Sequence, residues 1–569
     1  MNGVPLLSII TYLPLLGAVI LFAVPRLSAA AARWVALATS VVTLVASLLL
    51  LTGGAPGSSQ MQFVEDVAWL PGVGVRYHFG VDGLSILLII LSTLLTVVSV
   101  LVSWTAIQHR VREFFIAMLL LEMGFIGVFV SLDLFLFYVF WELSLIPMAL
   151  IIGVWGSRNR VYAAIKFFLY TLAGSLLMLV AIVATYQRYY ELTGVRTLDL
   201  LKLANPPLQQ LGMTSLSQFY PLNFQYWVFA AFFISFAIKV PMFPVHTWLP
   251  DAHTEAPTAG SVMLAGVMLK LGGYGMIRFC LPLFPDAARA AAPTIMILSA
   301  IAIVYGALVS LPQPDWKRLV AYSSISHMGF VTLGIFAFNQ QALQGATMVM
   351  FAHGLNTSAL FVLVGVVYER AHTRVIRAFS GLMTTMPVYA SLFGLFVFAS
   401  IALPGMTGFV GEFHTLMGTF RNPDQLARIV VIVSTAVIIF AAWYLLWLYQ
   451  RVAMGTPPGQ PALALAAAHG GGAPPGGGDH LPAPAPVGAL ARHREEATGV
   501  ERGSAAPSPD PEVGEAEAQH VTHLTDVNLR EILGLAPLAV LTVLFGMWPG
   551  PIFHLLGPTL ANVLRPFGQ

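Results

Sequence analysis

Charge is scarce in this sequence of 569 residues: only 9% of them are Asp, Glu, Lys or Arg, whereas about 25% is usual for a soluble protein. Hydrophobic residues make up 57%, and the mean hydropathy is +0.80. A hydrophobic core in water needs a charged surface to enclose it, and so few charges do not cover a chain of 61.4 kDa. These values exclude a water-soluble globular protein and indicate that lipid surrounds most of the chain.

Cysteine is nearly absent, since Cys280 is the only one. One thiol cannot form an intrachain disulfide, a cysteine-ligated iron–sulfur cluster or a cysteine-based zinc site. No G-x-G-x-x-G follows a strand pattern, and no G-x-x-x-x-G-K-[ST] is present. We therefore expect no redox, nucleotide or metal cofactor in this chain. The net charge of +2 likewise gives no indication of nucleic acid binding.

Long apolar runs dominate the sequence. Each has 18 or more residues, enough to cross about 30 Å of hydrocarbon as a helix. We therefore expect an all-α polytopic membrane protein with about fourteen transmembrane helices. No Lys or Arg precedes the first run, so we expect it to be a span and not a cleaved signal peptide. The predicted spans are 5–24, 33–52, 83–105, 114–131, 133–154, 162–186, 225–243, 256–279, 292–311, 318–338, 343–367, 387–415, 427–450 and 531–549.

Basic residues are distributed unequally between the loops on the two sides of the membrane. Cytoplasmic loops carry an excess of Lys and Arg, which sets the orientation. If the N-terminus is outside, the cytoplasmic side receives Arg26, Arg33, Arg110, Arg112, Arg158, Arg160, Lys317, Arg318, Arg370, Arg374, Arg377 and Arg451. The other side receives Arg76, Arg188, Arg196, Lys202, Arg278, Arg289, Arg421 and Arg428. The excess predicts that both termini are outside.

Several charged or titratable residues lie inside predicted spans, where a charge at the bilayer centre costs about 2.5 to 3.5 kcal/mol. At about 1.5 Å per residue, the deep ones are Glu142, Lys239, Lys270, His327, His353 and Glu412, whereas Lys166 is shallow enough to snorkel to the surface. Buried ion pairs without a transport role are one explanation. Six such groups at similar depth favour a proton path. Two histidines without carboxylate or thiolate support do not favour a zinc site.

Two predicted spans are interrupted by proline and glycine. KVPMFPVHTWLPD begins at Lys239, and LPGMTGFVGE ends at Glu412, which would keep that carboxylate within the membrane. Interrupted spans five helices apart, with ionisable groups at the breaks, are typical of inverted-repeat transporters. We therefore predict two inverted five-helix repeats with broken helices, at 114–280 and 281–453, after a three-helix segment at 1–113.

Residues 454–528 are rich in Pro, Gly and Ala and have an acidic excess. Such a composition cannot bury enough apolar surface to offset the entropy lost on ordering. We predict a flexible cytoplasmic insert, and we favour a tolerated linker over an arm that binds a partner. Residues 529–569 then form the last transmembrane helix and a tail.

The sequence around these charges resembles a known family. From Lys239 to Phe279 it reads KVPMFPVHTWLPDAHTEAPTAGSVMLAGVMLKLGGYGMIRF, with FYVFWELSLIPM around Glu142 and ALPGMTGFVGEF around Glu412. KFFLYTLAGSLLML from Lys166 and RLVAYSSISHMGF add to the likeness. Together they resemble the antiporter-like membrane subunits of respiratory complex I, more narrowly the chain M type, equivalent to mitochondrial chain 4. The HTEAPTAGSV element separates the sequence from the Mrp antiporters, and the lack of a long amphipathic helix after the last span separates it from the chain L type.

The resemblance implies roles for the buried residues. In this family the fifth-span Glu and the seventh-span Lys form one end of a proton half-channel, the eighth-span Lys connects to the second half, and the twelfth-span Glu faces the exit. His327 and His353 are relay candidates between the last two. The chain M type has Glu in the twelfth span where its relatives have Lys. The roles fall here on Glu142, Lys239, Lys270 and Glu412.

The resemblance also implies the function: a proton-translocating subunit of NADH:quinone oxidoreductase in a bacterial plasma membrane. It implies NADH, FMN, iron–sulfur clusters and quinone in partner subunits, and two flanking antiporter-like subunits. The insert at 454–528 is longer than the pattern of the family usually has. A subunit of a sodium/proton antiporter, a subunit of a membrane-bound hydrogenase complex and a purely structural subunit remain alternatives.

Overall fold

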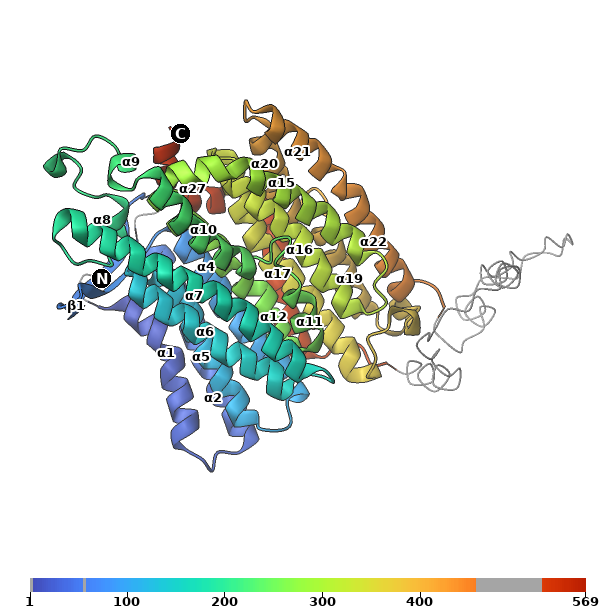
Figure 1. Ribbon diagram of the computed structural model, residues 1–569. Coiled ribbons are helices and arrows are strands. Elements are labelled where there is room, and N and C mark those ends of the chain that lie inside the picture. Colours follow the sequence, from blue (N-terminus) through green and yellow to red (C-terminus); the bar gives the residue numbers. More distant parts are fainter. Residues whose placement is uncertain (1–3, 55–57, 457–523, 569) are drawn as a thin grey trace, which may run out of the picture.

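The computed structural model describes residues 4–54, 58–456 and 524–568. Figure 1 shows a bundle of helices throughout these ranges. The insert predicted at 454–528 lies outside the described residues except for its first three and last five positions.

The N-terminal segment has three long helices and a hairpin. Its elements are α1 (Leu6–Ala23), α2 (Ala29–Leu48), α3 (Leu50–Gly53), β1 (Gln62–Leu70), β2 (Val75–Val81) and α4 (Gly83–Ala106). The strands β1 and β2 pair antiparallel, with Asp66 opposite His78 and two irregularities in register. The sequence analysis did not predict this hairpin, because a single strand pair between spans has no hydropathy signal of its own.

The first group of five predicted spans follows. Its elements are α5 (Val111–Val130), α6 (Leu134–Trp155), α7 (Arg160–Thr193), α8 (Leu200–Ala204), η1 (Gln209–Leu211), α9 (Leu216–Phe219), α10 (Leu222–Lys239) and α11 (Trp248–Glu255). A last span combines α12 (Thr258–Met263), the π-helical turn η2 (Leu264–Met268), α13 (Leu269–Gly275), the π-helical turn η3 (Met276–Cys280) and α14 (Leu281–Leu283). The predicted break lies at 240–247, between α10 and α11.

The second group has the same order. Its elements are α15 (Pro285–Ser310), α16 (Trp316–Ile335), α17 (Gln340–Ala371), η4 (Ile376–Ala378), α18 (Leu382–Thr385), α19 (Pro387–Ser400), α20 (Thr407–Phe420), α21 (Gln425–Thr435) and α22 (Val437–Ala453). Two further helices, α26 (Leu529–Met547) and α27 (Gly550–Leu564), and the 3₁₀ turn η5 (Arg565–Phe567) complete the described chain. The tail helix α27 packs against α4 and α17.

Polar caps fix where several helices begin. A carboxylate or amide side chain at the N-cap accepts a hydrogen bond from an otherwise unpaired backbone amide of the first turn. Asp82, Asp133, Asp315 and Asn339 do so for α4, α6, α16 and α17. Asn528 and Glu531 form a complete capping box at the start of α26.

In the described ranges, twelve helical segments are long and apolar enough to cross a membrane. The polytopic helical fold predicted from the sequence is thereby confirmed. The spans predicted at 318–338 and 387–415 correspond to α16 and to the broken pair α19 and α20, which are not among the twelve. The number fourteen therefore stays a prediction.

The two groups of helices pack alike. α5 contacts α6, α6 contacts α7, and α7 contacts α10; α15, α16, α17 and the broken pair α19 and α20 contact one another in the same order. A stretch of 18 residues in the span 258–283 and another in α17 are fully buried inside the protein. Both segments lie in the middle of the bundle in Figure 1, with α1 and α2 at one edge and α21 and α22 at another. This packing agrees with an internal repeat, while the boundaries 114–280 and 281–453 stay a prediction.

Candidate functional site

Four of the predicted site residues form a row across the second half of the bundle. The ammonium of Lys270 on α13 lies 2.7 Å from Nδ1 of His353 on α17 and also donates to the carbonyl of Ala265. The rings of His353 and His327, on α16, have centroids 5.9 Å apart. Nδ1 of His327 lies 2.9 Å from Oε1 of Glu412 on α20. A cation, two imidazoles and a carboxylate thus lie in sequence.

A small cavity lies beside the two histidines and Glu412. Its volume is about 10 Å³, and Asn356, Ser400 and Gly408 also line it. That is about the space that one water molecule needs. The Ser400 hydroxyl has no hydrogen-bond partner among the described residues, and neither has Nε2 of His353. Polar groups that face such a space are ready to bind a water between the imidazoles.

The break between α19 and α20 positions Glu412. The helix ends at Ser400 and starts again at Thr407, and the unwound residues include Ala402 and Gly405 with positive φ. The break is therefore shorter than the sequence indicated, because Gly408 and Gly411 lie inside α20. A Cβ on Gly411 would be 2.7 Å from the backbone nitrogen of Val349 on α17. Glycine at this position thus lets α20 lie close against α17.

A π-helical turn precedes Lys270. Residues Leu264–Met268 form this turn, and the carbonyl of Ala265 within it accepts a hydrogen bond from the Lys270 ammonium. Single π-helical turns inside α-helices occur frequently at functional sites. Lys270 is completely buried, so its position depends on these two partners, Ala265 and His353.

Glu142 and Lys239 lie near each other without an ion pair. Lys239 is the last residue of α10 and is 1% exposed, and its ammonium has no hydrogen-bond partner among the described residues. The ammonium lies 5.4 Å from the ring centre of Trp141, the residue before Glu142, and 5.5 Å from that of Phe167. Oε1 of Glu142 is likewise unpaired. Aromatic faces, and not a carboxylate, surround this cation.

Lys166 lies apart from the row. Its ammonium is 2.7 Å from Oδ2 of Asp251 on α11, and the two side chains are 21% and 26% exposed. The structure thus shows a partly exposed ion pair between α7 and α11. Asp251, within the motif HTWLPD, was not singled out in the sequence.

Several buried titratable residues were not singled out in the sequence, among them His253, Lys317 and Glu122. His253 on α11 is completely buried and stacks on Phe361 with ring centroids 4.7 Å apart. Neither of its ring nitrogens has a hydrogen-bond partner within the described part of the chain. Lys317 on α16 is 5% exposed and donates to the carbonyl of Ala256. Glu122 lies near the middle of α5 and is completely buried. Its depth was readable from the sequence, whereas Lys317 was counted as a loop residue.

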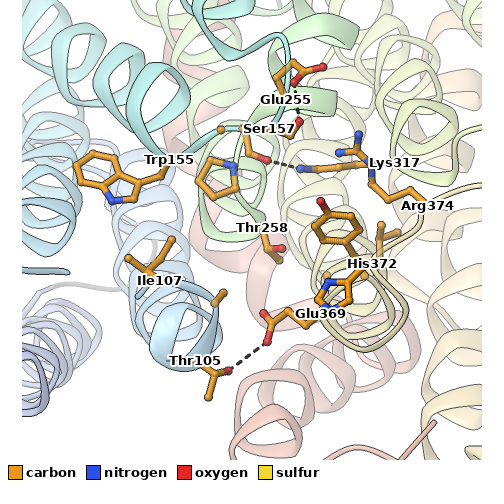
Figure 2. Close-up of a pocket in the computed structure, with 17 residues that line it drawn as sticks. Thr105, Ile107, Trp155, Ser157, Glu255, Thr258, Lys317, Glu369, His372 and Arg374 are labelled. Carbon is orange, nitrogen blue, oxygen red and sulfur yellow. Dashed lines mark hydrogen bonds between the residues drawn. The ribbon is translucent and has the colours of Figure 1, made fainter. Parts of the chain in front are cut away.

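A charged pocket of about 500 Å³ opens where α4, α6 and α17 end and α16 begins. Figure 2 shows the carboxylates of Glu255 and Glu369 and the cations Lys317 and Arg374 around it. Glu255 accepts hydrogen bonds from the Ser157 hydroxyl at 2.5 Å and the Asn159 amide at 2.9 Å. This charged pocket lies at the end of α11, less than one turn beyond His253.

No group of three His, Cys, Asp or Glu side chains converges as a metal site would require, within 4–54, 58–456 and 524–568. His327 and His353 each bond to one other protein group, Glu412 and Lys270 respectively. Each imidazole thus contacts one polar side chain, as in a chain of polar groups that relays protons.

Known proteins resemble this chain in sequence and in fold. The family described as NADH:quinone oxidoreductase/Mrp antiporter, TM, matches residues 131–439. NADH-quinone oxidoreductase subunit M of Rhodobacter capsulatus is 44% identical over 99% of this chain and 97% of its own length. NADH-ubiquinone oxidoreductase chain 4 of Arabidopsis thaliana is also 44% identical, over 78% and 85% of the two chains.

A solved structure shares the fold. A chain of respiratory complex I from Thermus thermophilus with bound NADH superposes with a TM-score of 0.76 and 28% identity, covering 99% of this chain and all of the other. Sequence and fold therefore lead to one conclusion. The chain belongs to the NADH:quinone oxidoreductase/Mrp antiporter family of transmembrane subunits.

Proposed function

We propose that Lys270, His353, His327 and Glu412 carry protons through the second half of this chain. The observation that supports this path is their row of contacts: 2.7 Å from Lys270 to His353, 5.9 Å between the imidazole centroids, and 2.9 Å from His327 to Glu412. Imidazole accepts a proton on one nitrogen and releases one from the other, so it relays protons between neighbours. Glu412 then faces the exit.

The chain is a proton-translocating membrane subunit of NADH:quinone oxidoreductase, similar over its whole length to subunit M. Moving one charge against 100 mV costs about 2.3 kcal/mol, and this chain contributes no redox chemistry of its own. NADH oxidation and quinone reduction, with FMN and iron–sulfur clusters, belong to other subunits of the complex. Two flanking antiporter-like subunits in a bacterial plasma membrane transmit the driving force to this one.

The first half-channel centres on Glu142 and Lys239. Because the two charges lie in one region without touching, a small displacement of either side chain changes how strongly Lys239 holds its proton. Lys239 ends α10 directly before the break, where a change in backbone geometry moves the ammonium. The pair thus couples helix movement to proton release, and Lys166 with Asp251 holds the neighbouring α11 in place.

The charged pocket is the entrance. Lys317 binds the carbonyl of Ala256 at the pocket wall. His253 lies less than one turn away on α11, and both its ring nitrogens lack a partner among the described residues. A proton taken up at Glu255 or Glu369 reaches the bundle centre through this imidazole, and Lys270 is the next buried base.

The decisive experiment replaces Lys270 by Met, which keeps an unbranched side chain one atom shorter and removes the charge. Assembled complex in membrane vesicles should still form, and NADH-driven proton uptake should fall to a small fraction of that of the native complex. Lys202→Met is the matched control, because that ammonium is half exposed on α8, and it should leave proton uptake unchanged. Native pumping by the Lys270 variant would refute the path.

A sodium/proton antiporter subunit is the second candidate, because the matching family includes Mrp antiporters. Such a subunit works without NADH. Vesicles with the assembled protein, loaded with sodium and given a pH gradient in the absence of NADH and quinone, distinguish the two. We expect no sodium efflux above that of vesicles that carry the Lys270→Met variant.

A further inference from the structure

Glu122 is a buried carboxyl group that the proposed path does not use. It is the twelfth residue of α5, is completely buried, and has no hydrogen-bond partner on either carboxyl oxygen in the described chain. The Thr96 hydroxyl of α4 lies against it, but that hydroxyl donates to the Ser92 carbonyl at 3.0 Å. An ionised carboxylate without partners is strongly disfavoured in such surroundings. The group therefore holds a proton.

The surroundings of Glu122 offer it no counter-ion. The helices α1, α2, α4, α6 and α13 and the strand β2 pack against α5, and none of their charged groups forms an ion pair with Glu122. The cations and the histidine on these elements have other partners. Arg33 binds Ile107 and Gln108, Lys270 binds Ala265 and His353, Arg76 binds Asp66, and His78 faces Asp199. Oε1 of Glu142 has no partner among the described residues. The negative charge of Glu122 is therefore neutralised by a proton on its own carboxyl group.

A line of hydroxyls connects Glu122 with the charged pocket. Thr96, Ser99 and Ser103 are three and four residues apart, so they share one face of α4, and each is at most 2% exposed. Among the residues that the structure describes, the Ser99 hydroxyl has no hydrogen-bond partner. Two residues beyond Ser103, Thr105 lines the charged pocket and donates to Glu369 at 3.1 Å, as Figure 2 shows.

The spacing of this line suits proton transfer. Successive hydroxyls are displaced by about 4.5 and 6 Å along the helix axis, a gap that one bridging water closes. A hydroxyl accepts a proton on its oxygen while its own hydrogen passes to the next acceptor, so each transfer leaves the hydroxyl as it was. The proton ends on the Glu122 carboxylate and leaves by the reverse steps.

We propose that Glu122 is a proton-holding site that exchanges protons with the charged pocket through Thr96, Ser99 and Ser103, as a branch separate from the Lys270 row. The branch does not depend on the proposed path, because it has its own acid and its own connection to the pocket. It gives the subunit a place to store a proton close to the entrance.

The first test reads the protonation of Glu122 by infrared spectroscopy of the purified complex. Glu122→Gln keeps the shape of the side chain and should remove one carboxylic acid C=O band present in the native complex. Glu122→Asp should shift that band, and this variant takes the place of Glu122→Gln in the test if the Gln variant does not assemble. Lys270→Met should leave the band in place. A native spectrum without a band that responds to Glu122 substitution overturns the proposal, and loss of the band in Lys270→Met overturns the separateness of the branch.

The second test reads the connection to the pocket, through deuterium exchange of the same band. Ser99→Ala should slow this exchange by roughly tenfold, equivalent to about 1.4 kcal/mol of added barrier. Thr93→Val is the control, since the Thr93 hydroxyl already pairs with that of Ser47 on α2 at 3.0 Å, and it should exchange as the native protein does. Equal rates in all three proteins, or equal slowing in both variants, overturn the hydroxyl line.

Discussion

The buried titratable residues of this protein are of two kinds. Lys270 and Glu412 each bond to an imidazole, and Arg278 forms a buried pair with Asp82 at 2.7 Å. Lys239 and Glu122 have no such partner in the part of the chain that the structure describes. A partner stabilises a charge in place, whereas a charge without one is free to change its protonation when its surroundings move. We therefore expect Lys270 and Glu412 to keep their positions, and Lys239 and Glu122 to respond to movements of their surroundings.

The contact between His327 and Glu412 provides a prediction at this scale. Removing one partner of a buried charged pair costs about 3 to 5 kcal/mol, whereas replacing both by apolar residues is often neutral. His327→Leu should therefore lower the melting temperature of the complex, and His327→Leu with Glu412→Leu should restore it. Neither protein should pump. Thermal unfolding and proton uptake measured on the same preparations check both statements.

All four members of the row were named from the sequence, because charge in an apolar run is conspicuous. The sequence did not identify His253, since one histidine beside a helix break looks like many others, and it gave no distances. The 2.7 and 2.9 Å contacts depend on how α13, α16, α17 and α20 pack, and packing at that level does not follow from hydropathy. Glu122 was readable from its depth alone, although its lack of partners was not.

At the scale of elements, close packing of α17 against α20 brings Glu412 to the row. Gly345 and Gly418 make that approach possible, because a Cβ at either would be 2.3 Å from a backbone nitrogen of the opposite helix, of Thr415 and Ala342 respectively. Breaks were predictable from Pro and Gly, since these residues interrupt helices in any surroundings. The place where α20 starts was not, because Gly408 and Gly411 serve the packing and not the break.

Gly345→Ala tests this packing. The added methyl group should push α20 from α17, cost about 1 to 3 kcal/mol of stability, and separate His327 from Glu412, so that pumping falls. Gly557→Ala on α27 is the control, because its Cβ would meet only side-chain atoms at 3.6 and 3.8 Å. Proton uptake and thermal unfolding of the two variants are compared. Equal behaviour would contradict a requirement for close approach at Gly345.

The hairpin offers a pH-dependent prediction. Burial alone raises the pKa of Asp199, at the start of α8, but the facing His78 of β2, 3.6 Å away, and the Leu201 amide lower the pKa below its ordinary value. The folded pKa is thus below the unfolded one of about 3.9, so the carboxylate stabilises this contact above that pH and the contribution is lost as the pH falls through the folded pKa.

Hydrogen exchange of the β2 and α8 amides measures this effect. In the native complex we expect protection at neutral pH and its loss in acid. Asp199→Asn should reduce protection already at pH 7 and show little further loss. Asp66→Asn removes a partly exposed pair with Arg76, which is worth about 0 to 1 kcal/mol, and should behave like the native protein. If Asp199→Asn still lost its protection in acid, the pH dependence would belong to another titratable group.

At the scale of the whole molecule, charge distribution ties the site to the two sides of the membrane. The charged pocket lies among the ends of α4 and α6 and the start of α16, on the side that the excess of Lys and Arg predicts to be cytoplasmic. The row from Lys270 leads from the span 258–283, in the middle of the bundle, to α20. With this orientation of the chain, the proposed path takes up protons on the cytoplasmic side and releases them on the other side.

Labelling of single cysteines determines that orientation. The only natural thiol, Cys280, is completely buried, so an introduced cysteine is read against a silent background. Thr214→Cys lies on an exposed loop between α7 and α10, and Arg158→Cys on an exposed loop between α6 and α7. With the N-terminus outside, a membrane-impermeant maleimide should label the first in intact spheroplasts and the second only in inside-out vesicles. The reverse pattern would place the charged pocket outside and would contradict proton uptake through this pocket from the cytoplasmic side.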